Sequence, residues 1–345
     1  MEPPPTSHPN PHVTMQDVAD RAGVSAQTVS NVVNGRTARV GPETIERVSR
    51  VIDELGYRLN QSARSLRKGR TGIIGLGVPV LASEYYGELA ERLSRRFAER
   101  GIRLVTENTG GAMPAEVESL AASHLETYDG YILAIAASES ADLNRILPTK
   151  PIVLLGERAL SSRFDHVLMD NVGGARSATG HLLDRGARSV VALGGVRSGP
   201  ESVQTLRTRG YDDAHRERGL EARPELILDA GLHIADGYRA ITELINQGVE
   251  FDGVFALTDS SAHGALRALA DRGVGVPSQV QIVGFDNVQA GAYTIPRLTT
   301  IEPGNDEMAD EIVSVMLTRL QSGPPSGDRR RIMVPTRLVV RESTR

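Results

Sequence analysis

The chain has 345 residues, of which 40% are hydrophobic and 24% charged, so it is long enough for two or three globular domains. The absence of Cys excludes disulfides and thiol chemistry, and no apolar run approaches the roughly 20 residues that cross a bilayer. The formal net charge of −4 argues against a nucleic-acid binder, yet residues 12–70 carry ten Lys or Arg against six Asp or Glu. Unless this is a chance fluctuation over a short window, a basic head precedes an acidic body.

The first residues predict a disordered leader. Residues 1–12 hold five prolines and no periodicity, and they lack the positive charge and apolar stretch that open a signal peptide. We therefore expect a cytoplasmic protein.

Residues 13–59 predict three short helices, the first two joined by a tight glycine turn. The residues that start and stop these helices are a capping box at Thr14 and Asp17, the breaker Gly23, the cap Ser25, the start Gly41 with Pro42, and the stop Gly56. The basic residues 60–71 follow without a core-forming stripe, so they predict a hinge.

From Gly72 onward, apolar runs alternate with helical patterns. The predicted buried strands are IIGLGV, IRLVTE, YILAIA, PIVLLG, VVALGG, GVFALT and VQIVGF. The predicted helices span residues 85–100, 174–185, 203–219, 235–248 and 260–272. This alternation predicts parallel sheets with helices on both faces, and a length of about 275 residues favours two packed α/β lobes with a ligand cleft between them.

The second predicted helix is dense in small polar side chains, namely Ser25, Gln27, Thr28, Ser30, Asn31 and Asn34. Short hydroxyls and amides let a backbone approach phosphates closely, and Gln or Asn can pair with adenine edges. A helix of this kind after a glycine turn predicts a helix-turn-helix unit whose second helix enters the major groove. The alternative is a small helical domain with a polar surface helix.

The residues also resemble a known family. VTMQDVADRAGVSAQTVSNVVNG, followed by VGPETIERVSRVIDELGYRLNQSARSLR, is similar to the headpiece of the lac repressor (LacI/GalR) family, and DNVGGARSATGHLLDRGARSVVALGG, LRALADRGVGVPSQVQIVGFDN and IPRLTTI are similar to its effector domain. The resemblance implies an all-α helix-turn-helix headpiece (13–59), a hinge (60–71) and a two-lobed periplasmic-binding-protein-like α/β domain (72–345). The expected lobes are residues 72–172 with 302–331, and residues 173–301 with 332–343.

The resemblance also implies roles on DNA. Contacts to phosphates or to the duplex are expected from Thr14, Ser25, Thr28, Ser30, Asn34 and Tyr57. Ala26 and Gln27 match the main base-reading pair, and Arg39 is placed to reach the groove edge. Asn31 stands where the family very often has Arg, which removes a guanine contact and leaves the operator sequence open.

The hinge begins at Asn60 and contains Leu66, an isolated apolar residue with no local core to join. Leu66 is either a linker residue that packs on the body or, as the resemblance implies, a wedge that enters the minor groove and bends the duplex. One headpiece buries little surface, so we expect a homodimer on a pseudo-palindromic double-stranded operator. The family's additional tetramer-forming helix is not found after LVVREST.

Charged and aromatic residues near the predicted strand ends suggest a sensing site. The candidates are Tyr85, Tyr86, Asp170, Arg207, Asp259 and Asp286, of which the resemblance matches Arg207 and Asp286 to ligand-contacting positions. Paired Arg and Asp groups suit a polyhydroxylated ligand, although each could instead form an inter-lobe salt bridge or a helix cap. By the resemblance, Glu201 stands where a purine-binding relative has Arg, and Leu232 stands where sugar- and purine-binding relatives have a stacking aromatic. A purine is therefore disfavoured, and a sugar needs the two tyrosines to cover its apolar face. We expect a carbohydrate or its phosphate.

Other chemistry finds little support in the sequence. Gly75-Leu76-Gly77 lacks the third glycine of a dinucleotide loop, GGVRSGP lacks the key residues of a phosphate loop, and the His residues do not fall at metal-ligand spacing. We expect no cofactor, metal or membrane, and a transcription regulator, chiefly a repressor, under allosteric control by a small molecule. A sugar-binding transport protein and an enzyme with an appended DNA-binding head are the alternatives.

Overall fold

The computed structural model describes residues 13–57, 70–156, 163–322 and 329–345. The chain forms two compact units, Met1–Thr71 and Gly72–Arg345, and the division lies where the sequence predicts the end of the hinge. The predicted leader, and the hinge residues Asn60 and Leu66, lie outside the described residues. Within those residues, no helix is long and apolar enough to cross a membrane.

The described residues of the first unit, 13–57, form three α-helices around a small core. They are α1 (Met15–Ala22), α2 (Ala26–Val33) and α3 (Pro42–Leu55), with the single-turn 3-10 helix η1 (Thr37–Arg39) before α3. The core consists of Val18, Ala19, Ala22, Val29, Val48 and Val51. Because these apolar side chains recur every three or four residues, each helix buries one face and leaves the opposite face in solvent.

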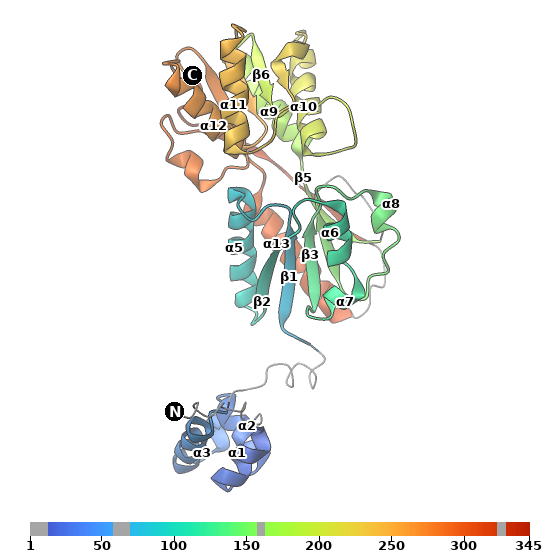
Figure 1. Ribbon diagram of the computed structural model, residues 1–345, viewed down its shortest axis with the longest axis vertical. Helices are drawn as coiled ribbons and strands as arrows, with labels where there is room; N and C mark the ends of the chain where they lie inside the picture. Colours follow the sequence, from blue (N-terminus) through green and yellow to red (C-terminus); the bar gives the residue numbers. More distant parts are fainter. Residues whose placement is uncertain (1–12, 58–69, 157–162, 323–328) are drawn as a thin grey trace, which may run out of the picture. The chain divides into compact units, whose positions relative to one another are not determined.

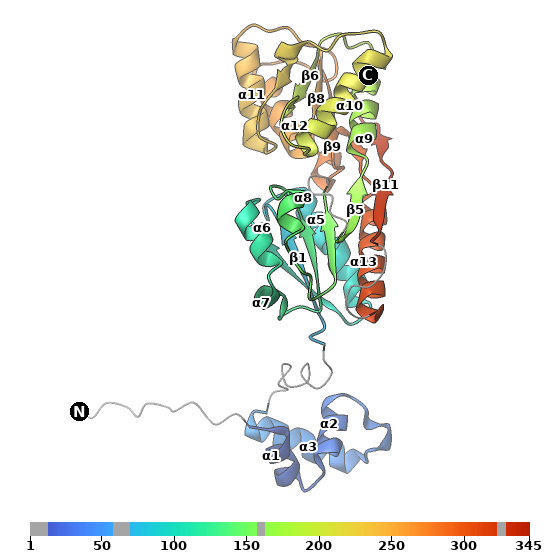
Figure 2. The same cartoon turned by 90° about the vertical axis from the view of Figure 1, so that its right-hand side faces the viewer.

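The second unit contains two six-stranded sheets, each flanked by helices on both faces (Figure 1, Figure 2). The first sheet has the order β11-β5-β4-β3-β1-β2 and is parallel throughout; its strands are β1 (Ile73–Val78), β2 (Arg103–Asn108), β3 (Gly130–Ala134), β4 (Ile152–Leu155), β5 (Asp165–Met169) and β11 (Arg331–Val334). The second has the order β12-β10-β9-β8-β6-β7; its strands are β6 (Val190–Leu193), β7 (Ile227–Leu228), β8 (Gly253–Ala256), β9 (Gln281–Phe285), β10 (Thr299–Glu302) and β12 (Arg337–Val339). Among the described strands of this sheet, β12 alone runs antiparallel to its neighbour, β10.

Helices cover both faces of each sheet. One face of the first sheet is covered by α5 (Glu84–Ala98) and α13 (Asn305–Ser322). The other face is covered by α6 (Met113–Ser119), α7 (Ala122–Leu125) and α8 (Ser140–Leu143). On the second sheet they are α9 (Asn171–Asp184) and α10 (Val203–Glu217) on one face, and α11 (Ile234–Asn246) and α12 (Asp259–Asp271) on the other, with the 3-10 turns η2 (Pro224–Leu226) and η3 (Gln289–Ala292). Strands buried between two helical layers read as continuous apolar runs, which is why most of them were visible in the sequence.

The chain passes between the two lobes after β5, after β10 and after β11. The third passage differs from the prediction, because β11 keeps residues up to Val334 in the first sheet, three residues beyond the predicted limit at 331. Only Pro335 and Thr336 separate β11, in the first sheet, from β12, in the second, so residues 331–339 contribute a strand to each sheet.

Candidate functional site

The turn between α1 and α2 sets the geometry of the first unit. The hydroxyl of Thr14 accepts the N–H of Asp17 at 3.2 Å, and the Asp17 carboxylate accepts the N–H of Thr14 at 2.7 Å, which completes the predicted capping box. These hydrogen bonds lower the pKa of Asp17. Gly23 ends α1 with a φ of 65°, a left-handed conformation that favours glycine, and Ser25 then caps α2 by accepting the N–H of Thr28 at 3.1 Å.

The exposed surface of α2 carries hydrogen-bonding groups and no charge. The helix contains neither an acidic nor a basic residue, and its one fully buried side chain, Val29, fixes which face turns inward. Gln27 is exposed and donates to the Asn31 side chain one turn later at 3.2 Å. A neutral row of amides and hydroxyls suits base edges, which combine donors and acceptors, and the helix N-terminus suits a phosphate.

The other predicted DNA contacts lie on α2 itself or on neighbouring elements of the first unit. Ala26, Thr28 and Ser30 are half-buried on α2, whereas Arg39 is exposed on η1. Asn34 donates to the backbone carbonyl of Ser30, 2.5 Å away, so this amide also closes the C-terminus of α2. Tyr57 packs against the core of the three helices. The structure thus places five of the predicted contacts on α2 and two at its ends, whereas Thr14, Arg39 and Tyr57 lie on other elements of the same unit. Asn60 and Leu66 lie outside the described residues.

In the second unit, Arg207 of α10 collects groups from the carboxyl ends of several strands. Its guanidinium donates to Asn171 Oδ1 at 2.8 Å, to the carbonyl of Leu257, and to Asp286 Oδ1 at 3.4 Å. It also stacks on the Phe285 ring, 3.5 Å from the centroid. Arg207 and Asp286 are 2% and 6% exposed, so this ion pair is largely removed from solvent.

Two carboxyl groups of this region are perturbed by burial. Burial raises the pKa of Asp286 to about 7, although the positive charge of Arg207 opposes the shift. Burial and the neighbouring Asp286 carboxyl raise the pKa of Asp259 well above its ordinary value. Asp259 is completely buried, and its two oxygens accept the Thr300 hydroxyl at 2.5 Å and the Val288 N–H at 2.9 Å. Asp259 therefore holds the loop after β9 in this structure, and its part in ligand binding stays a prediction.

The remaining candidates stand at neighbouring strand ends. Asp170 follows β5 and caps α9 by accepting the Gly173 N–H at 2.8 Å, which is the cap that the sequence left open as an alternative. Tyr85 and Tyr86 lie half-buried at the start of α5, with their rings edge to face at 5.0 Å. The Tyr85 hydroxyl lies 3.9 Å from the Met308 sulfur of α13. Arg207 and Asp286 are joined directly, whereas the tyrosines contact the first lobe.

Sequence reasoning missed two asparagines beside this ion pair. Asn171 Nδ2 and Asn305 Oδ1 are buried and have no hydrogen-bond partner within the described chain. Asn305 also donates to the backbone carbonyl of Asp286 at 3.0 Å. The dipeptide Asp170-Asn171 directly follows β5 and could have indicated Asn171, but the sequence analysis did not recognise β5 as a strand. Among the described residues, no group of three or more His, Cys, Asp or Glu could hold a metal ion.

Comparisons with known proteins decide the family. Residues 14–60 match the bacterial regulatory proteins of the lacI family, and residues 179–344 match a periplasmic binding protein-like domain. The transcriptional regulator AscG of Escherichia coli K12 is 31% identical over 316 residues, which cover 90% of this chain and 93% of AscG. The chain belongs to the lacI family of bacterial regulatory proteins. It is therefore a DNA-binding transcription regulator and not an enzyme, as the sequence predicted.

Two solved structures share the arrangement of this lacI-family chain. The transcriptional regulator CelR in complex with cellobiose is 29% identical, with a TM-score of 0.68 over 96% of this chain and 99% of CelR. The lac repressor dimer bound to operator and the anti-inducer ONPF is 25% identical, with a TM-score of 0.78 over 96% of this chain and 99% of that one. The predicted fold class, a helix-turn-helix headpiece with a two-lobed parallel α/β domain, is confirmed.

Proposed function

We propose that this regulator is a cytoplasmic repressor that binds a pseudo-palindromic operator as a homodimer. A sugar that binds the second unit changes its affinity for the operator, either lowering or raising it. The observation that carries the first part is the uncharged polar surface of α2, presented after a rigid turn of two capped helices. The likeness to the lac repressor dimer on its operator supports the partner and the dimer.

In this proposal α2 lies in the major groove with Ala26 and Gln27 against base edges. The hydroxyls of Ser25, Thr28 and Ser30 serve phosphates near the N-terminus of the helix, together with the Thr14 hydroxyl. The other DNA contacts are Asn31, Asn34, Arg39, Tyr57 and, in the hinge, Asn60 and Leu66. Phosphate contacts position the headpiece, whereas the Gln27 amide and its Asn31 neighbour provide the sequence preference.

The effector site in this proposal is the polar group around Arg207 and Asp286. The two guanidinium nitrogens lie 3.4 Å from Asp286, a weak hydrogen-bond distance, so a ligand hydroxyl beside this pair can form a shorter, charge-assisted hydrogen bond with either group. Asn171 and Asn305 add one unused donor and one unused acceptor. Such alternating groups fit a polyhydroxylated ligand, and the complex of CelR with cellobiose supports a sugar.

Coupling to DNA follows from contacts that cross between the lobes. The Glu88 carboxylate of α5 accepts the N–H of Gln289, in the loop after Asp286, at 2.6 Å. A ligand that moves Asp286 therefore strains a hydrogen bond to the first lobe, from which the chain leads to the headpiece. Coupling free energies of this kind are typically about 1–3 kcal/mol.

Two copies require an apolar surface that the monomer leaves open. On the second lobe, Ile234 and Tyr238 of α11 are 49% and 38% exposed, and Tyr293 and Ile295 after η3 are 77% and 96% exposed. Large apolar side chains in solvent mark interaction surfaces, so we propose this group as part of the dimer interface.

Genome-wide footprinting of the full chain tests the proposal. We expect enriched sites with two-fold symmetry, and operator affinity that changes about 5–150-fold when cellobiose or another sugar of a panel is added. Binding without any recurring sequence would contradict the DNA-reading role. Recurring sites that respond to no sugar would contradict only the sensing role.

A further inference from the structure

The first lobe carries a cluster of positive charge where its parallel strands begin. We define this strand-start edge as residues 99–103, 126–129, 148–151, 163–165, 319–322 and 329–331. These segments hold eight Lys or Arg against four Asp or Glu. Residues 1–71 hold ten of the chain's 39 basic and seven of its 43 acidic residues, so residues 72–345 hold 29 and 36. A basic edge therefore stands on an acidic unit.

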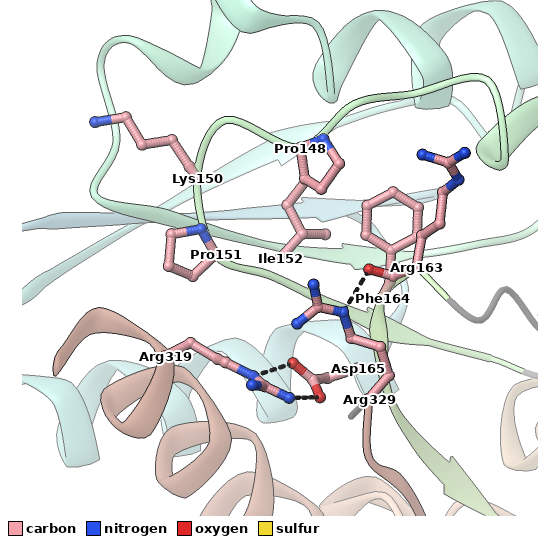
Figure 3. Close-up of a pocket in the computed structure, with 9 residues that line it drawn as sticks. All are labelled: Pro148, Lys150, Pro151, Ile152, Arg163, Phe164, Asp165, Arg319 and Arg329. Carbon is pink, nitrogen blue, oxygen red and sulfur yellow. Dashed lines mark hydrogen bonds and ion pairs between the residues drawn. The ribbon is translucent and has the colours of Figure 1, made fainter. Parts of the chain in front are cut away.

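Two of the four acidic residues of the edge accept backbone N–H groups of the lobe. Asp165 accepts the Nε and a terminal nitrogen of Arg319 at 2.8 Å each, and it also accepts the backbone N–H of Arg330 at 2.8 Å (Figure 3). Asp129 accepts the backbone N–H of Gly72 at 2.7 Å. These bonds neutralise Arg319 and fix the backbone, but they leave the positive excess of the edge in place.

Lys150, Arg330 and Arg331 present that excess outward. The side chains of Arg330 and Arg331 are exposed, and Lys150 is half-buried and extends away from the Arg319–Asp165 pair in Figure 3. The backbone of Arg330 is held on both sides, because its carbonyl accepts the His166 N–H at 2.8 Å. The charges therefore project from a rigid strand end, which reduces the conformational entropy that a partner must overcome.

The place of this edge in the chain indicates the partner. β1 begins at Ile73, so the chain from the headpiece enters the second unit at this edge. From Tyr57 to Arg70 the backbone reaches at most roughly 45 Å, at 3.3–3.6 Å per residue. Duplex DNA held by the headpiece is thus tethered close to a basic surface, and a duplex presents one negative charge about every 1.7 Å along its axis.

We propose that the strand-start edge of the first lobe contacts the phosphate backbone of the DNA to which the headpiece binds. This inference rests on the proposed function, since it requires DNA on the headpiece. Phosphates carry no sequence information, so the edge adds affinity and salt dependence equally on operator and on random duplex. Base preference stays with α2.

The test compares the salt dependence of binding in two triple variants of the full chain. One carries Lys150→Gln, Arg330→Gln and Arg331→Gln. The matched control carries Arg176→Gln, Arg216→Gln and Arg223→Gln, three exposed arginines of the second lobe, and loses the same total charge. Affinity is measured between about 50 and 200 mM salt. One duplex carries the footprinted site with long flanks, and the other is a random duplex of equal length.

For the edge variant we expect a slope of log affinity against log salt that is shallower by about 0.9 for each lost contact, on both duplexes. The control should keep the wild-type slope, and the ratio of operator to random affinity should stay unchanged in both variants. If the edge and control variants share one slope, the inference is overturned. If the triple variant fails to fold, the single variant Arg331→Gln replaces it. Its slope of log affinity against log salt should be shallower than that of the wild type by up to about 0.9.

The two proposals fail separately. A wild-type protein that shows no preference for any site would contradict the proposed function. The salt slopes of the edge and control variants on random duplex would still test whether the edge contacts phosphates. If the wild-type protein prefers its operator but all variants share one salt slope, only the proposed phosphate contact of the strand-start edge is contradicted.

Discussion

The headpiece and the Arg207 site are built in opposite ways. All described candidate DNA contacts lie between Thr14 and Tyr57, and seven of the ten lie on one eight-residue helix or are its two caps, Ser25 and Asn34. Arg207 and the groups around it come from five separate segments of the chain, which meet at the carboxyl ends of strands.

This difference predicts where each site is sensitive. A local site depends on caps and turns, each worth about 1 kcal/mol, and on the chemistry of single exposed side chains. An assembled and buried site depends on mutual satisfaction of charges, so the loss of one partner leaves another charge buried.

Removal of the Arg207 side chain should cost most. Arg207→Ala leaves the buried Asp286 carboxyl without its cation, and we expect the free energy of unfolding to fall by about 3–5 kcal/mol at pH 8, where Asp286 is ionised. Urea denaturation measures the change. The exposed neighbour Arg209→Ala should stay within about 0.5 kcal/mol of wild type. Equal small losses in both variants would show that the site does not depend on this pair.

Gln27→Ala should lose base reading while the headpiece stays folded. We expect operator affinity to fall by about 1–3 kcal/mol, with affinity for scrambled duplex unchanged. Gln16→Ala is the matched control, because Gln16 is an exposed glutamine on α1 that donates to Asp20 at 2.7 Å. A parallel loss on both duplexes would assign Gln27 to phosphate contacts instead.

The ligand response should depend on pH through Asp286. Its pKa is raised to about 7, so the carboxyl is mostly protonated below that pH and ionised above it. A ligand hydroxyl that donates to the carboxylate binds the ionised form, and sugar affinity should rise with pH, by up to tenfold per unit below 7, and level off above. Calorimetric titration between pH 5.5 and 8.5 measures this. Asp286→Asn should give a flat profile, and a wild-type profile equally flat would contradict the role of Asp286.

The smallest expected effect is loss of the α2 cap. Ser25→Ala removes the hydroxyl that accepts the Thr28 N–H, which should destabilise the helix by about 1 kcal/mol. Hydrogen exchange of the α2 amides should then speed up about fivefold. Ser49→Ala, on the exposed surface of α3, should leave it unchanged. Similar exchange in both variants would mean that packing of Val29, and not the cap, holds the helix.

The same contrast explains what the sequence could predict. The capping box at Thr14, the Gly23 turn and the long apolar strands were visible because local interactions determine them. The strand β5 and the helix α13 were not recognised. β5 is five residues long and begins with the buried Asp165, which pairs with Arg319, 154 residues away.

The site of the second unit was only partly predictable for the same reason. Arg207 and Asp286 were found, but the burial of Asp259 depends on Thr300 and on the loop at Val288, which no local pattern indicates. Asn171 and Asn305 were missed because their neighbours come from other strands.

The most direct measurement is a competition titration of the purified full chain between its footprinted site and a scrambled duplex of equal length at about physiological salt. If α2 reads base edges, the footprinted site should be preferred by at least about a thousandfold. Equal affinity for both duplexes would contradict the account, whatever ligand is present.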